Sequence, residues 1–144
     1  MRVGLMMSRG NIAVTFEFAR RLLVVDIDGG FEKSRIQRLL GGVSPAARIE
    51  LLSELGVELV VCGAISRPVS SLVTARGMQL VPLVFGNGER VLAGLFEDRL
   101  EDPCFLFPDC SAEDRARLLE RRGAVPLCSI GRGRKIEPDG KEWQ

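Results

Sequence analysis

The apolar positions of the first forty residues fall into short runs separated by polar and glycine-rich turns. Two runs come first, at 2–7 and 21–26, and each is long enough for a strand. The tight-turn sequence Asp28-Gly29-Gly30 then leads into 31–38. We therefore predict three strands that begin the chain, the last two forming an antiparallel hairpin.

The hydrophobic period then changes to that of a helix. A helix is predicted to begin at Ser44-Pro45 and to end at Gly56. Its apolar stripe consists of Ile49, Leu51, Leu52 and Leu55. The charged residues between them, Arg48 included, are predicted on the opposite, solvent-facing side.

Two further strand–helix units follow. The continuous apolar run 57–62 is typical of a buried strand, and Ser66 is predicted to begin the helix after it. That helix is predicted to end at Gly77. Its inward positions are Val69, Leu72 and Val73.

The next strand is predicted over 78–85, where Pro82 indicates a sheet edge or a strand end because proline has no N–H for a ladder bond. Asn87 is predicted to cap a third helix. The apolar positions of that helix are Val91, Leu92, Leu95 and Phe96.

This order of elements predicts an α/β sandwich with a mixed five-stranded sheet. Right-handed crossovers would place 57–62 beside 2–7 and 78–85 beyond it, all three parallel. Their carboxyl ends would then meet, and open α/β sheets usually bind ligands at such ends. The pattern at 12–19 is ambiguous and fits either an extended segment or a single helical turn.

The loops at those ends, 8–11, 63–67 and 86–88, form the predicted ligand crevice. Six residues in and beside them are candidates for binding: Arg9, Cys62, Gly63, Ser66, Arg67 and Asn87. Two helix starts and two arginines facing one crevice favour a polyanion, such as a phosphate, a nucleotide or a carboxylate-bearing metal cluster.

Cys62 ends an apolar strand at a helix entrance, where a thiol loses its proton more readily and can act as a soft metal ligand. The alternative is that Cys62 is a small buried hydrophobe. A second metal site built from Cys104, Cys110 and Cys128 is conceivable, but their spacing matches none of the tight pairs of zinc or iron–sulfur sites.

The composition excludes several classes of function. The chain has 144 residues, 46% hydrophobic and 27% charged, as is typical of one globular domain. Its formal net charge of +1 gives no electrostatic footprint for nucleic acid, and the short basic segment 131–135 has no interleaved aromatic residues for base stacking. The absence of histidine excludes histidine-based catalytic triads and histidine–zinc sites.

The compartment can also be predicted. No apolar run approaches the length of a membrane span, and the amino terminus lacks the apolar stretch of a secretory signal. The four cysteines are irregularly spaced, which indicates reduced thiols. We therefore expect a cytoplasmic protein without membrane contact.

A change in composition divides the chain into a domain at 1–102 and an extension at 103–144. The apolar segment 103–108 is bounded by prolines and is a candidate surface for a protein partner or for self-association. A short helix is predicted after Ser111, followed by a possible strand over 124–130 and a mobile tail.

Three segments resemble the nitrogenase iron–molybdenum cofactor biosynthesis family, whose NifX-like domain also forms the carboxyl half of some NifB proteins. They are Phe16-Glu-Phe-Ala-Arg-Arg-Leu-Leu-Val-Val-Asp26, the stretch 51–65 (LLSELGVELVVCGAI) and the stretch 75–82 (ARGMQLVP). The middle segment is the most specific. The resemblance covers roughly residues 1–100, the length of one small domain.

The resemblance implies a ribonuclease H-like three-layer fold. It also implies a domain that binds or carries the iron–molybdenum cofactor or its iron–sulfur precursors without catalysing a reaction. Family members often have a histidine before the phenylalanine of the first motif and a glycine after it; these positions are Thr15 and Glu17 here. The implied cofactor site therefore includes Thr15 with the crevice residues, and Cys62 would be the metal ligand.

Two hypotheses from different classes follow. The first is a non-catalytic binding module that seats an anionic metal cluster or a precursor at Cys62 and the three loops. The second is a protein-interaction or regulatory domain in which the crevice is vestigial. A thiol enzyme using Cys62 is a weaker third option because no general base is visible, so we expect no enzymatic activity.

Overall fold

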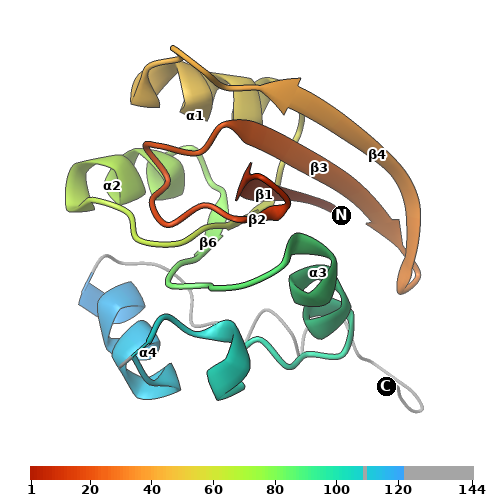
Figure 1. Ribbon diagram of the computed structural model, residues 1–144. Helices are drawn as coiled ribbons and strands as arrows, with labels where there is room; N and C mark the ends of the chain where they lie inside the picture. The colour runs from red at the N-terminus through yellow and green to blue at the C-terminus, as the bar shows by residue number, and fades with distance from the viewer. Residues whose placement is uncertain (109, 122–144) are drawn as a thin grey trace.

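The computed structural model describes residues 1–108 and 110–121, which form an open mixed β-sheet with helices on both faces (Figure 1). The strands of the described residues are β1 (Arg2–Ser8), β2 (Asn11–Ile12), β3 (Arg21–Asp28), β4 (Phe31–Leu39), β5 (Leu59–Val61) and β6 (Gln79–Val81). The helices are α1 (Pro45–Glu54), α2 (Arg67–Ala75), α3 (Gly88–Phe96), the 3₁₀ turn η1 (Pro103–Phe105) and α4 (Ala112–Arg121).

The strand order β4-β3-β1-β5-β6 confirms the predicted topology. β3 pairs antiparallel with β1 and with β4, and β5 pairs parallel with β1 and with β6. Because α1 and α2 provide the crossovers, the carboxyl ends of β1, β5 and β6 meet at one edge, as expected. β6 is an edge strand, and Pro82 follows it directly.

The sheet has six strands in the described residues, whereas five were predicted. The additional strand is β2, which pairs antiparallel with the end of β1 and lies at the start of the segment that the pattern left ambiguous. The two later parallel strands are also shorter than predicted, at three residues each.

The three predicted helix starts are confirmed as side-chain caps. The Ser44 hydroxyl accepts a bond from the Ala47 N–H at the start of α1, and Ser66 does the same for Val69 at the start of α2. Asn87 accepts bonds from two N–H groups of α3. Each cap satisfies donors that a helix cannot pair internally.

Two apolar layers hold the sheet between its helices. One layer, which includes Met6, Leu22 and Leu52, packs under α1 and α2, and the other, which includes Leu5 and Leu23, packs against α3. Alternation along β1 and β3 therefore buries both faces of the sheet centre.

Two residues of the predicted helix faces are placed differently. Leu72 was expected inward but is 47% exposed, whereas Arg48 was expected in solvent but is 5% exposed. The Arg48 guanidinium donates to four backbone carbonyls, those of Phe16, Ala19, Leu40 and Val43, at distances of 2.7 to 3.1 Å. A buried guanidinium is tolerated because these bonds replace its hydration.

The segment 103–108 packs on its own chain. Phe105 and Leu106 are buried, and the Phe85 N–H donates to the Phe105 carbonyl at 3.0 Å. Phe105 and Leu106 therefore pack inward, whereas Pro103, Cys104 and Pro108 are exposed, and the expected contact of this segment with a partner stays a prediction. The predicted strand over 124–130, the tail after it and Cys128 lie outside the described residues.

Helix α4 is tied to the sheet by a second buried arginine. The Arg115 side chain is 1% exposed, and its guanidinium donates to the carbonyls of Pro82 at 2.8 Å and Leu100 at 2.7 Å. Burial lowers the pKa of Arg115 to about 10. No helix of the described residues is long and apolar enough to cross a bilayer.

We predict that Arg48→Met destabilises the fold, because methionine fills similar space but leaves four buried carbonyls without their donor. The free energy of unfolding, measured by urea denaturation, should fall by about 3 kcal/mol. The exposed Arg38, replaced in the same way, is the control and should change it by less than about 0.5 kcal/mol. Equal effects of the two substitutions would contradict the structural role of Arg48.

Candidate functional site

The predicted crevice at the carboxyl ends of β1, β5 and β6 is filled by the chain itself. The segment 11–16 runs across all three ends, and its backbone forms hydrogen bonds with β1 and with residues that follow β5 and β6. Ile12 N–H donates to the Gly86 carbonyl at 2.8 Å, and Ala13 N–H donates to the Met6 carbonyl at 2.9 Å. Further along, the Val14 carbonyl accepts from the Ala64 N–H at 2.8 Å.

Two glycines of the crevice allow this close packing because they have no side chain. A Cβ atom on Gly63 would lie 2.4 Å from the backbone oxygens of both Ala13 and Val14. A Cβ atom on Gly88 would lie 2.2 Å from the Met7 Cε. Gly63 was predicted as a binding residue, and in the structure its missing side chain lets the backbone of 13–14 approach closely.

The start of α3 has few N–H groups left for an anion. Asn87 Oδ1 accepts from Glu89 N–H at 2.9 Å and from Arg90 N–H at 3.1 Å, and Gly88 N–H donates to the Gly10 carbonyl. The N–H groups of Gly88, Glu89 and Arg90 are therefore not available to an anion, because the Asn87 cap and the 8–11 turn accept from them.

Cys62 is 0% exposed and belongs to the apolar layer under α1 and α2. This placement agrees with the alternative prediction, that Cys62 is a small buried hydrophobe. A metal ligand at a crevice rim needs an accessible sulfur, so the expectation that Cys62 lies at such a rim is corrected.

The other predicted residues are dispersed. Arg9 is exposed in the turn between β1 and β2, with a positive φ of 53°, and Arg67 is exposed at the first position of α2. Neither lines the cavity described next. Of the predicted set, Thr15 and Ser66 are brought together.

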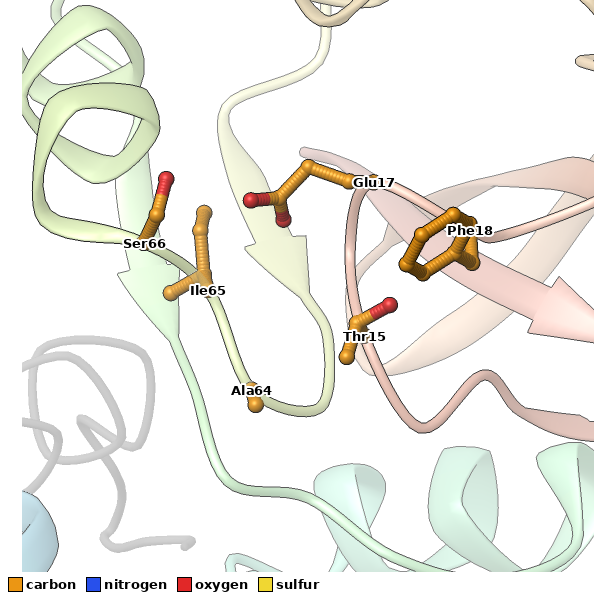
Figure 2. Close-up of a pocket in the computed structure, with 6 residues that line it drawn as sticks. All are labelled: Thr15, Glu17, Phe18, Ala64, Ile65 and Ser66. Atoms are coloured by element: carbon orange, nitrogen blue, oxygen red, sulfur yellow. The ribbon is translucent and has the colours of Figure 1, made fainter.

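Thr15 and Ser66 line a surface cavity of about 300 Å³ between the segment 15–18 and the start of α2. Its other lining residues are Glu17, Phe18, Ala64 and Ile65. Figure 2 shows the Glu17 carboxylate pointing toward Ile65 and Ser66, with Thr15 beside Ala64. The Phe16 N–H donates to the Ala64 carbonyl at 2.8 Å, which fixes the two walls relative to each other.

Two polar atoms of this cavity are buried without a partner in the described structure. They are the Thr15 hydroxyl oxygen and the Glu17 Oε1 atom. A buried oxygen that makes no hydrogen bond costs free energy, and such groups in a cavity wall indicate a missing ligand atom or water. This pair is the strongest chemical signal in the cavity.

The charge around Glu17 is partly balanced from within the protein. Burial lowers the pKa of the Arg48 guanidinium, and the negative charge of Glu17 acts against that shift. Arg48 makes no ion pair with Glu17, because its donors bind backbone carbonyls. The Glu17 Oε1 atom thus has no hydrogen-bond partner in the described structure and stays available to a ligand.

The start of α2 adds little direct binding capacity. The Ser66 Oγ atom accepts from the Val69 N–H at 3.4 Å, and Pro68 has no N–H. The helix dipole still places partial positive charge at this wall. The Ser66 hydroxyl hydrogen remains a possible donor to a ligand.

The chemistry of the cavity is that of a binding site with oxygen ligands. Within residues 1–108 and 110–121, no group of three cysteine, histidine or acidic residues is arranged to hold a metal ion. A carboxylate and two hydroxyls can coordinate a metal that brings further ligands, or can bind a ligand with hydrogen-bond donors.

Glu17 and Phe18 were not among the predicted site residues. The sequence offered one signal, since Glu17 occupies the position where the resembled family usually has glycine. Nothing in the local pattern indicated that its carboxylate would be buried beside α2, because that contact joins residues far apart in the chain.

Comparisons with known proteins show a shared fold. The crystal structure of a protein named PH0822 has a TM-score of 0.64 at 22% identity, covering 69% of this chain and 93% of that one. A protein from Methanocaldococcus jannaschii described as a "putative dinitrogenase" has a TM-score of 0.56 at 19% identity, with 69% and 90% covered. A Thermotoga protein described as a "putative NifB protein" has a TM-score of 0.53 at 17% identity. The match covers 68% of this chain and 89% of that one. No protein-family model matches the sequence, and no curated protein gives a significant match.

We predict that Gly63→Ala destabilises the protein, because the added methyl group would collide with two backbone oxygens that cannot move independently. The free energy of unfolding should fall by about 3 kcal/mol, measured by thermal or urea denaturation. Gly41→Ala is the matched control, since a Cβ atom at Gly41 meets nothing within 4 Å. A stable Gly63→Ala protein would mean that the segment 11–16 does not lie across β5.

Proposed function

We propose that this chain is a non-catalytic binding domain of the kind used in nitrogenase cofactor assembly. Its ligand is a metal-bearing precursor, an iron–molybdenum or iron–sulfur cluster, held in the cavity between 15–18 and the start of α2. The observation that carries the proposal is the pair of unpartnered buried oxygens on Thr15 and Glu17 in the wall of that cavity.

The number of protein ligands favours a preassembled cluster over a bare ion. A bare metal ion held by protein alone needs about four or more ligand atoms. The cavity offers one carboxylate and two hydroxyls. A cluster carries most of its own ligands, so one or two anchoring atoms are enough.

Glu17 supplies the anchor in this proposal. Carboxylates are established ligands of iron in proteins, so the Glu17 oxygen would bind a metal atom of the cluster directly. The Thr15 and Ser66 hydroxyls and the start of α2 would then bind the anionic atoms around it. Few anchors also make release easy, as a carrier requires.

One further observation supports this assignment. Two solved structures of similar fold are described as a "putative dinitrogenase" and a "putative NifB protein". The proposal assigns no chemical step to the domain.

A second candidate function is favoured by two exposed apolar side chains, that of Phe18 in the cavity lining and that of Val14, which precedes Thr15 in the chain. Val14 is 67% exposed and Phe18 is 79% exposed, and both are large apolar side chains. Exposed aromatic and aliphatic groups of this kind often mark contacts with another protein. The same face would then bind a protein that delivers or receives the ligand.

We predict that oxygen-free reconstitution with iron, sulfide and molybdate loads the wild-type protein, as measured by metal analysis and the absorption spectrum. Glu17→Gln should weaken the binding of the loaded species about tenfold or more, because an amide is a much poorer metal ligand. Cys62→Ala should keep the binding, because the thiol is buried in the core.

The matched control is Glu54→Gln, which removes an exposed carboxylate of α1 away from the cavity. A wild-type protein that takes up neither iron nor molybdenum would contradict the proposal. Loss of uptake in Cys62→Ala with an unchanged circular dichroism spectrum would contradict the placement of the anchor at Glu17.

A further inference from the structure

We propose a second ligand site, in a groove between the β3–β4 hairpin and the start of α3, that binds a small organic monocarboxylate. The groove has a volume of about 260 Å³. This proposal is independent of the function proposed above, because it uses different residues on the opposite face of the sheet.

The floor of the groove separates it from the first cavity. Met7 and Leu23 line the groove and belong to the apolar layer under α3. Phe16, next to the first cavity, belongs to the layer under α1 and α2. The sheet therefore lies between the two sites, and the groove offers an apolar surface to the body of a ligand.

One wall of the groove carries an available positive charge. Arg21 lines it, and among the residues that the structure describes it has no carboxylate partner. Its one side-chain hydrogen bond is a long contact of 3.5 Å to the Gln37 Oε1 atom. A guanidinium without a carboxylate is suited to a bidentate contact with one from a ligand.

The second arginine of the groove is already neutralised. Arg35 binds Glu32 and Glu89, with a distance of 2.8 Å between Arg35 Nη2 and Glu89 Oε1. These bonds raise the pKa of Arg35 and lower the pKa of Glu89. The pair thus links β4 to the start of α3 and closes the groove on that side.

Two side-chain amides complete the polar wall. Gln37 accepts the contact from Arg21 through its oxygen, and Asn87 accepts the α3 cap bonds through its own oxygen. Each therefore has an NH₂ group that makes no hydrogen bond with the described residues. Together with the Arg21 guanidinium, these two NH₂ groups give the groove three donor side chains above an apolar floor.

This arrangement selects the class of ligand. Donors around a single positive charge favour one carboxylate, and Met7 and Leu23 favour a short apolar chain behind it. Glu89 disfavours a second negative charge at the far wall. The volume is slightly below that of ordinary drug-sized sites, so the ligand is small.

The test is a titration of the full chain, labelled with nitrogen-15, with hexanoate followed by amide chemical shifts. Hexanoate should shift the amides of Leu23, Gln37 and Asn87 saturably, and the neutral analogue hexanamide should bind about tenfold more weakly or worse. Arg21→Gln should weaken hexanoate binding by a similar factor. Arg21→Lys, which keeps the charge but loses the fork of donors, should bind with intermediate affinity.

The matched control is Arg38→Gln, because Arg38 lies opposite Leu22 on the other face of β4 and should leave hexanoate binding unchanged. Equal binding by Arg21→Gln and wild type would overturn the proposal, as would the absence of saturable shifts in wild type. Inorganic phosphate binding as tightly as hexanoate would overturn the ligand class. Shifts confined to 15–18 and 64–66 would assign the carboxylate to the first cavity and also overturn it.

Discussion

The structure depends on one constraint, which is that the segment 11–16 lies across the carboxyl ends of the three parallel strands. Its backbone bonds to residues that follow β5 and β6 and to the end of β1, so it satisfies groups that would otherwise face an open crevice. The usual ligand position of an open α/β sheet is therefore occupied by protein. Access for a ligand is moved outward, to the cavity that the continuation of the same segment forms with the start of α2.

Two buried arginines hold the parts of the chain that have no regular backbone pairing. Arg48 binds four carbonyls and fixes the bend at 16–19 that carries Glu17. Arg115 binds carbonyls after β6 and before η1, and so joins α4 to the domain. Both act as multivalent donors in places where sheet or helix bonds cannot reach. The position of the Glu17 carboxylate is therefore set by core packing, as a preorganised binding group requires.

The sequence was sufficient for the sheet order, because right-handed crossovers leave one arrangement for strands separated by helices. The helix caps could also be predicted, because capping depends on residues within one turn; they are Ser44, Ser66 and Asn87. Other features depend on distant contacts. Arg48 was assigned to solvent because of its charge, although carbonyls from two loops surround it. Cys62 was placed at a rim because its strand was expected to end in the open, and Glu17 was noted only as a departure from a motif.

The accessibility of the Cys62 thiol in the native protein tests the filled crevice most directly. The measurement is the rate of alkylation at each cysteine, followed by mass spectrometry, with the exposed Cys104 as an internal reference. Cys104 should be modified rapidly, and Cys62 should be modified only at the rate of unfolding. Alkylation of Cys62 as fast as that of Cys104 in folded protein would contradict this prediction, because the crevice would then be open.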